Sequence, residues 1–146
     1  MKIKDIMTKD PATVTPNATV REAARLMQRE DTGILPVVEE GSKKLLGVIT
    51  DRDIAIRVAA EGRDVNTPVS DVMTTGRLVT LQPGADVEDA MEKMADEQVR
   101  RIPLVDDRGM LVGIVAQADI VRKVRDDRKA ERTVEKISEP SRRHAQ

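Results

Sequence analysis

A pattern of about 66 residues occurs twice in this chain of 146 residues, and this duplication limits the fold more than any other feature. The stretch Lys4–Thr8 returns as Ser70–Thr74, and Leu35–Val38 returns as Ile102–Val105. A repeated pattern of this length indicates two copies of one structural unit. Because a unit of about 60 residues buries its own apolar face poorly, we expect the two copies to face each other and to share one core.

The hydrophobic periodicity changes several times within the first copy. Residues 12–15 (Ala-Thr-Val-Thr) are typical of a short strand. Apolar side chains then recur at helical spacing over residues 20–27, behind a capping box made by Thr19 and Glu22. The remaining elements expected in this copy are strands at 34–38 and 45–50 and a helix at about 52–60.

The second copy repeats this order. A stripe of Val and Met side chains follows Asp86, and we expect strands at 102–105 and 110–115 and a helix at about 118–128. Each copy therefore has the order strand, helix, strand, strand, helix, which predicts an α+β fold.

The composition divides the chain into four segments. We expect repeat 1 over residues 1–62, a linker over 63–69, repeat 2 over 70–128, and a charged tail over 129–146. Apolar residues in the tail extend the last helix by a turn or two, Pro140 ends it, and the chain is expected to be disordered beyond Ser138.

The absence of Cys and of aromatic residues, together with a single His, excludes several function classes. The chain has no Cys and a single His, His144, so thiol chemistry, Cys-based zinc sites and a His-based triad have no residues to use. It has no Phe, Tyr or Trp, and its net charge is −1, which makes nucleic-acid binding improbable. A planar ligand would have to lie between aliphatic side chains or Arg planes.

Nothing in the sequence points to a membrane. Residues 1–5 have no apolar signal core behind them, and no apolar run approaches the length of a membrane span. We therefore expect a soluble, cytoplasmic protein.

The two copies resemble a tandem pair of CBS domains, the regulatory repeat named after cystathionine β-synthase. The resemblance covers about residues 2–126 and is carried by the Asp-Ile/Val-Met-Thr opening, by the strands containing Pro36 and Pro103, and by residues 47–54 (Gly-Val-Ile-Thr-Asp-Arg-Asp-Ile). It implies two pseudo-twofold-related β-α-β-β-α repeats packed sheet to sheet, with two clefts for adenosine-containing ligands and dimerisation through the helices.

The resemblance also implies roles for individual residues. Asp53 and Asp119 occupy the position whose carboxylate accepts hydrogen bonds from ribose hydroxyls. Thr50 occupies the position that binds a phosphate, whereas the second copy has Ala116 there. Arg52, Arg100 and Arg101 are further candidates for neutralising the phosphate charge. The residues expected to surround the base are Thr13, Ile34, Leu35 and Pro36 in one cleft and Thr80, Ile102 and Pro103 in the other.

A purely structural interpretation of the same residues stays open. Thr50 and Asp53 also form an ordinary capping box, which requires no ligand. Arg100 and Arg101 also fit a solvated pair, and the mixed charges from Arg122 to Glu135 fit a solvated helical face.

Four functions follow from these alternatives. The first is a regulatory module and homodimer that senses an adenine nucleotide such as AMP, ADP or ATP, or else S-adenosylmethionine or NAD, as regulatory ligand, with no required cofactor. The second is an interaction module with empty or degenerate clefts and an unidentified protein partner, which Ala116 favours. An enzyme is third, because no acid–base pair or P-loop is present. Nucleic-acid binding is fourth.

Overall fold

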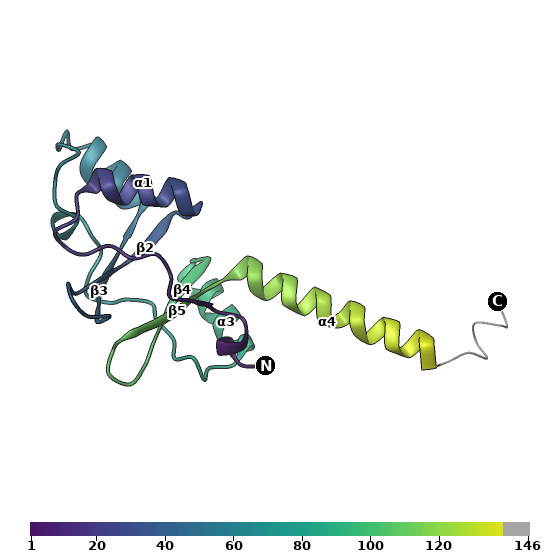
Figure 1. Ribbon diagram of the computed structural model, residues 1–146. Coiled ribbons are helices and arrows are strands. Elements are labelled where there is room, and N and C mark those ends of the chain that lie inside the picture. The colour runs from purple at the N-terminus through teal and green to yellow at the C-terminus, as the bar shows by residue number, and fades with distance from the viewer. Residues whose placement is uncertain (139–146) are drawn as a thin grey trace.

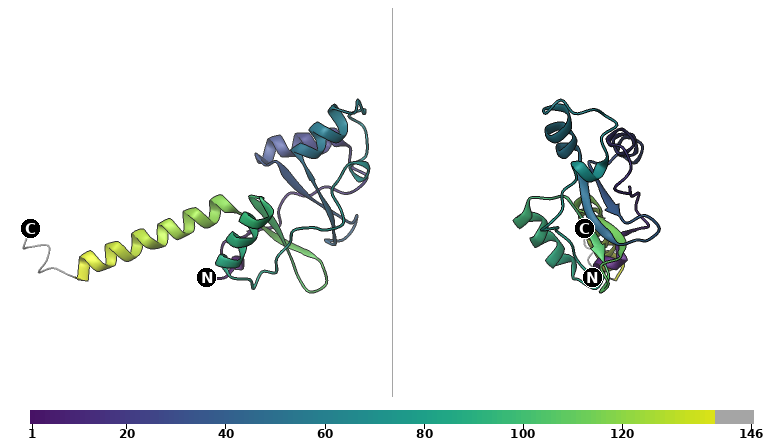
Figure 2. Two further views of the ribbon diagram at one scale, coloured as in Figure 1. Left: turned by 180° about the vertical axis from the view of Figure 1, so that it is seen from behind. Right: turned by 90° about the vertical axis from the view of Figure 1, so that its left-hand side faces the viewer.

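The computed structural model describes residues 1–138, with side chains up to residue 134. The two halves of the chain form two β-hairpins, each accompanied by two helices, and they lie side by side with their hairpins toward the middle (Figures 1 and 2). The helices are α1 (Val20–Glu30), α2 (Asp51–Asp53) with its continuation η2 (Ile54–Ala59), α3 (Val87–Glu97) and α4 (Gln117–Ser138).

The hairpins are the predicted strand pairs. β2 (Ile34–Val38) pairs antiparallel with β3 (Leu45–Thr50), and β4 (Arg101–Val105) pairs antiparallel with β5 (Leu111–Ala116). The bounds of β2 and β3 agree with the prediction, and those of β4 and β5 differ by one residue at their ends. The strand expected at residues 12–15 consists of one parallel bridge, between Val14 and Val37.

The caps predicted from the sequence form in the first half. The Glu22 backbone N–H donates to Thr19 Oγ1, and the Thr19 N–H donates back to Glu22 Oε2, both at 3.1 Å. α2 begins with a second capping box, made by Thr50 and Asp53. The predicted helix over about 52–60 is present, with its last two-thirds wound as the π-helical turn η2.

Each half is completed by a segment from the opening of the other repeat. The segment η1 (Ile3–Asp5) and β1 (Thr8–Lys9) packs on the second half, where the Ile3 N–H donates to the Ala85 carbonyl at 2.9 Å and β1 pairs with β5. Around the pseudo-twofold axis, η3 (Val69–Asp71) packs on the first half, and the Val69 N–H donates to the Ala18 carbonyl at 2.8 Å.

The described residues contain two clusters of buried side chains, so the expectation of one shared core is wrong. The first cluster joins side chains of α1, β2 and β3 to Val69 and Val72, and the second joins side chains of α3, β4 and β5 to Ile3. The two halves are held together because each takes part of the other repeat into its own core, which gives two small cores in place of a single large one.

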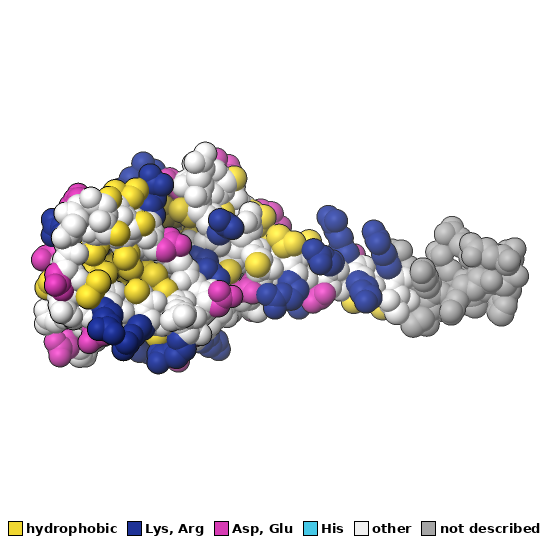
Figure 3. Space-filling model, turned by 90° about the horizontal axis from the view of Figure 1, so that it is seen from above, with side chains coloured by type: hydrophobic (Ala, Val, Ile, Leu, Met, Phe, Trp, Pro, Cys, Tyr) yellow, Lys and Arg dark blue, Asp and Glu magenta, His cyan; other side chains and the backbone are white. Residues whose placement is uncertain are grey.

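α4 extends far beyond the rest of the fold. It starts against α3 and projects into solvent, so that its far half stands clear of the body in Figure 1 and in the left-hand view of Figure 2. The predicted end of repeat 2 at residue 128 falls inside this helix. Basic side chains gather along the projecting part, whereas apolar side chains gather over the opposite end of the molecule (Figure 3). The disorder expected beyond Ser138 lies outside the described residues.

Candidate functional site

A cleft of about 270 Å³ lies between the two hairpins and contains Asp119. Its walls come from the first repeat's opening, from β2 and from the β5–α4 junction. The predicted residues that line it are Ile34, Leu35, Pro36, Arg101 and Asp119. The cleft is therefore mainly aliphatic, and its charged lining consists of the carboxylates of Glu30 and Asp119 and the guanidinium groups of Arg101 and Arg122.

Asp119 lies in the first turn of α4, where its carboxylate has few partners. In the described part of the chain it accepts one hydrogen bond, from Arg122 Nη2 at 2.9 Å. Its side chain is 31% exposed. Because Ala116 has no hydroxyl, the full capping box of the first repeat cannot form here. With Arg122 as its hydrogen-bond donor in the described structure, the Asp119 carboxylate can accept further hydrogen bonds from a ligand.

Asp53, at the equivalent position of the first repeat, is in a different environment. Its side chain is only 10% exposed, and its carboxylate accepts hydrogen bonds from the Thr50 N–H at 3.0 Å and from Thr74 Oγ1 at 3.1 Å. Arg57 Nε lies 3.8 Å from it. The capping-box interpretation of Thr50 and Asp53 is confirmed, and a ribose could reach this carboxylate only by displacing Thr74.

Thr74, which covers the carboxylate at the Asp53 site, has a counterpart at the Asp119 site. Thr74 and Thr8 correspond in the repeat, and both lie in the segment that crosses to the other half. Thr8 lines the Asp119 cleft. In the described structure, no hydrogen bond joins the Thr8 side chain to the Asp119 side chain. The two sites thus occupy equivalent positions of the repeat but differ in access. Thr74 closes the Asp53 site, and the Asp119 site is open to a ligand.

A second, larger cavity of about 1070 Å³ adjoins the Asp119 cleft. The two share part of their walls, since Ile34, Arg101 and Arg122 line both. The larger cavity also contains Thr50 and brings together the side chains of five arginines: Arg52, Arg100, Arg101, Arg122 and Arg125. We call this cavity the arginine groove.

Other predicted site residues lie away from both cavities. Thr13 lines a separate surface hollow beside α1, while its neighbours Pro11 and Ala12 line the Asp119 cleft. Ile102 and Pro103 are buried in β4, and Thr80 lies before the parallel bridge from Leu81 to Leu104. These four residues belong to the predicted base sites, and their ligand contacts stay predictions.

Sequence reasoning missed four residues that shape the sites. Arg122 and Arg125 were assigned to a solvated face of the last helix, but both line the arginine groove. Thr8 and Thr74 were recognised only as part of the opening pattern. Their recurrence in the repeat was the signal that could have identified them, but their positions depend on the crossing of the opening segments.

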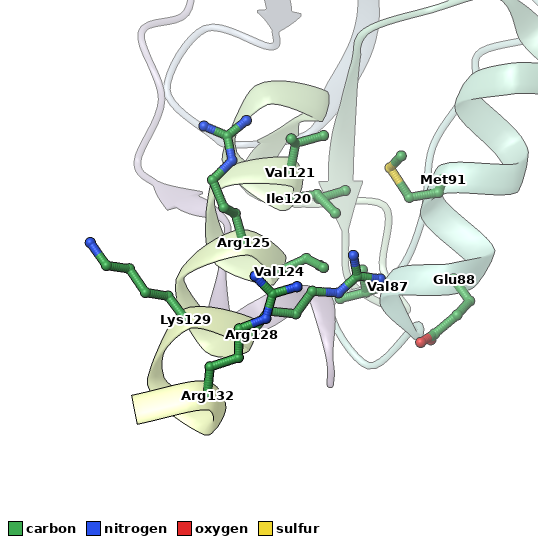
Figure 4. A pocket seen from close by; sticks show the side chains of 10 residues that line it. All are labelled: Val87, Glu88, Met91, Ile120, Val121, Val124, Arg125, Arg128, Lys129 and Arg132. Carbon is green, nitrogen blue, oxygen red and sulfur yellow. The ribbon is translucent and has the colours of Figure 1, made fainter. Parts of the chain in front are cut away.

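A third hollow, of about 780 Å³, lies between α3 and α4. Val87 and Met91 from α3 face Ile120, Val121 and Val124 from α4, and basic side chains follow along α4 at its rim (Figure 4). Val121 and Val124 are 42% and 36% exposed. We call this surface the α3–α4 groove; it is an apolar floor with a basic edge.

The described residues contain neither a candidate metal site nor a membrane-spanning helix. No group of three or more His, Cys, Asp or Glu side chains within residues 1–138 is placed to hold a metal ion. None of the helices described in the structure combines the length and the apolarity needed to cross a membrane.

Comparisons with known proteins agree with the architecture. Residues 3–60 and 69–126 each match the model of the CBS domain. The chain is 52% identical over 118 residues to the CBS domain-containing protein YhcV of Bacillus subtilis (strain 168), which covers 81% of this chain and 81% of that protein.

Two solved structures are similar and contain adenosine compounds. One is the CBS domain pair of protein MJ0100 in complex with 5′-methylthioadenosine and S-adenosyl-L-methionine (32% identity, TM-score 0.74, 85% of this chain and 99% of that one). The other is CBSX2 in complex with AMP (26% identity, TM-score 0.75, 87% of this chain and 98% of that one). The chain therefore belongs to the CBS domain family, as a tandem pair of CBS domains with the α+β fold of such pairs.

Proposed function

We propose that this CBS pair is a regulatory, non-catalytic protein that binds one adenosine-containing nucleotide per chain, in the Asp119 cleft. The observation that carries the proposal is the contrast between two equivalent carboxylates. Asp119 borders a cavity and accepts one hydrogen bond within the described structure, whereas Asp53 is buried under Thr74. The adenosine compounds in two similar CBS structures support the ligand class.

The cleft has the groups that an adenosine requires. The Asp119 carboxylate can accept charge-assisted hydrogen bonds from both ribose hydroxyls. Pro11, Ala12, Ile34 and Pro36 line the cleft and offer aliphatic surface to adenine. The phosphate end would point past Ala116 toward the first turn of α4, where backbone N–H groups and the helix dipole favour an anion.

Thermal unfolding followed by circular dichroism tests this proposal. The protein is heated alone and with millimolar AMP, ADP, ATP, S-adenosylmethionine or NAD. A ligand present at 100 times its Kd adds about 2.7 kcal/mol to the free energy of unfolding, which raises the midpoint by several degrees at this chain length. We expect at least one adenine nucleotide to give this rise.

Two variants assign the effect to the cleft. Asp119→Ala should abolish the ligand-induced rise while changing the midpoint of the free protein little, because the ion pair it loses is exposed. Asp126→Ala is the matched control, since it removes a carboxylate from the same helix but lines no described cavity. An unchanged rise in Asp119→Ala would remove Asp119 from the site.

The alternative function is an interaction module whose clefts bind nothing. It is favoured by the closed Asp53 site and by Ala116 in the other repeat. It predicts no change of the midpoint with any of the five compounds. Absorbance gives an independent check: because the chain has no aromatic residue, a 260 nm band released by heating a preparation free of nucleic acid reports a co-purified nucleotide.

The nucleotide signal would be transmitted through a homodimer. The apolar floor of the α3–α4 groove, with Val121 and Val124 exposed on it, offers a second copy a helical surface next to the ligand cleft. Arg125 lines both the α3–α4 groove and the arginine groove. A ligand that orders this side chain would therefore alter the dimer surface directly.

A further inference from the structure

The arginine groove is too large and too basic to serve as a simple continuation of a nucleoside cleft. Its five guanidinium groups come from α2, from the start of β4 and from α4, and the one carboxylate that lines it is Asp51. The Asp51 carboxylate already accepts a hydrogen bond from the Arg52 backbone N–H at 2.8 Å. Elements from both repeats therefore direct positive charge into one space.

Most of these arginines have no carboxylate partner. Arg122 is paired with Asp119 at 2.9 Å. Among the described residues, no carboxylate lies within 4.0 Å of the guanidinium groups of Arg52, Arg100, Arg101 or Arg125. Unpaired like charges that share a cavity repel one another and raise the local concentration of anions. The groove thus concentrates positive charge in one place and favours an anionic ligand.

The sizes of the two cavities indicate how the ligand is divided between them. Sites for drug-sized molecules occupy roughly 300–1,000 Å³. The Asp119 cleft, at about 270 Å³, suffices for a nucleoside, and the adjoining groove, at about 1070 Å³, is left for the rest of the ligand. Arg101 and Arg122 line the shared wall, so that a phosphate chain leaving the cleft would pass between them into the groove.

We infer that the arginine groove binds a polyphosphate chain, and that the ligand of this protein is a nucleoside triphosphate or a longer polyphosphate; the position of the nucleoside rests on the proposed function. Guanidinium groups match phosphate oxygens with paired hydrogen bonds. A monophosphate would reach the arginines at the shared wall but would leave Arg52 and Arg100 without an anion. S-adenosylmethionine, whose sulfonium is cationic, would be repelled by the groove.

Isothermal titration calorimetry tests the inference with five probes: adenosine, AMP, ADP, ATP and inorganic tripolyphosphate, at 150 mM salt without divalent cations. We expect the affinity to rise at each added phosphate and to be at least tenfold higher for ATP than for AMP. S-adenosylmethionine should bind at least tenfold more weakly than ATP. Higher salt should weaken ATP more than AMP, because more charges are screened.

A double variant locates the effect. Arg52→Gln with Arg100→Gln removes two charges that line the groove but not the Asp119 cleft. It should lower the affinity for ATP at least tenfold and bring it close to that for AMP. The control, Arg21→Gln with Arg29→Gln, removes the same charge from α1, outside the groove, and should retain the preference for ATP.

The outcomes separate this inference from the proposed function. Binding of AMP and ATP with equal affinity overturns the inference and leaves the nucleotide site standing. Binding of tripolyphosphate that the double variant weakens, without binding of any adenosine compound, supports an anion groove and overturns the proposed function. If no probe binds, both are wrong.

Discussion

Two aspartates that occupy one position of a repeat have taken different roles in this protein. Asp53 accepts hydrogen bonds from Thr50 and Thr74 and is buried, so it ties the helix after β3 to the opening of the other repeat. Asp119 lacks the cap, because Ala116 replaces the threonine, and it faces a cleft. The Thr74 hydroxyl covers the Asp53 carboxylate, whereas its counterpart Thr8 makes no hydrogen bond to Asp119 in the described structure, and this contact separates a structural carboxylate from one that is available to a ligand.

This difference predicts opposite phenotypes for two equivalent substitutions. Asp53→Ala should lower the free energy of unfolding by about 2–4 kcal/mol, since it removes a helix cap and leaves the Thr74 hydroxyl without its acceptor. Asp119→Ala should lower it by less than about 1 kcal/mol. Urea unfolding of both variants measures the two costs. Equal costs would mean that Asp119 is as structural as Asp53.

The reverse substitution restores the cap. Ala116→Thr places a hydroxyl next to the first turn of α4, at a position that borders both cavities and has room for it. With Asp119 three residues later, it should re-create the capping box and raise the free energy of unfolding by about 0.5–2 kcal/mol. The same urea series measures the gain, and a loss of stability would contradict the account of Ala116.

At the scale of elements, two glycines mark the positions where the opening segments cross. A Cβ at Gly47 would lie 2.5 Å from the Thr74 carbonyl oxygen, and one at Gly113 would lie 2.9 Å from the Thr8 carbonyl oxygen. The strands β3 and β5 can therefore accept these segments only where they have no side chain.

Gly47→Ala should consequently destabilise the fold. The new methyl group meets backbone, which cannot move aside as a side chain can, and overpacking of this kind costs about 1–3 kcal/mol. Gly84→Ala is the matched control, because a Cβ there meets no atom within 4 Å. Comparison of the two midpoints of thermal unfolding tests the crossing, and equal midpoints would argue against it.

The contact between the N-terminal segment and α3 makes stability depend on pH. Lys2 Nζ donates to Asp86 Oδ1 at 2.8 Å, and this hydrogen bond holds the pKa of Asp86 below its ordinary value of 3.8. A lowered pKa in the folded state stabilises the fold above the unfolded-state pKa, and that contribution is lost as the pH falls through the folded-state pKa.

Asp86→Asn should therefore be less stable than the parent protein near pH 6, and the difference should shrink as the pH falls below 3.8. The effect is small because the pair is half exposed. Thermal midpoints of both proteins from pH 2.5 to pH 7 measure it. A difference that stays constant over this range would exclude the ion pair as its cause.

Much of this level of structure could be predicted from the sequence, because it is local. The apolar strand segments and the turn residues between them predicted β2 and β3, and the capping box of Thr19 and Glu22 predicted the start of α1. The last helix was expected at about 118–128, with an extension of a turn or two into the tail before Pro140, and α4 ends at Ser138. Side-chain pairs such as Lys123–Asp127, at 3.4 Å, support this exposed helix.

The candidate site was harder to predict, because it depends on segments that are far apart in the sequence. The repeat identified Asp53 and Asp119 as equivalent, but it could not show that Thr74 covers one of them. The mixed charges of the last helix assigned Arg122 and Arg125 to a solvent-facing surface, which is correct for an isolated helix. They line a groove only because the first repeat lies opposite.

At the scale of the whole molecule, the cavities follow from how the two repeats face each other. The Asp119 cleft and the arginine groove have walls from both halves, and a ligand held there would fix their relative position. The α3–α4 groove lies next to them and exposes apolar side chains (Figure 4). Ligand binding and self-association are therefore expected to be coupled.

The proposed dimer predicts an assembly defect that leaves the fold intact. Val121→Glu with Val124→Glu places two charges on the floor of the α3–α4 groove, which a second copy would have to bury. Sedimentation velocity should show a dimer for the parent protein and a monomer for the variant, with unchanged circular dichroism. A monomeric parent protein would contradict the proposed dimer.

The central claim is that one nucleotide binds per chain, at Asp119, and calorimetric titration of ATP into the parent protein and Asp119→Ala tests it most directly. We predict a stoichiometry of one ATP per chain in the parent protein and at least tenfold weaker binding in Asp119→Ala. Two ATP per chain would contradict it, because a second nucleotide would have to enter the site where Thr74 closes Asp53. An affinity for ATP that is unchanged in Asp119→Ala would also contradict it, because Asp119 would then lie outside the binding site.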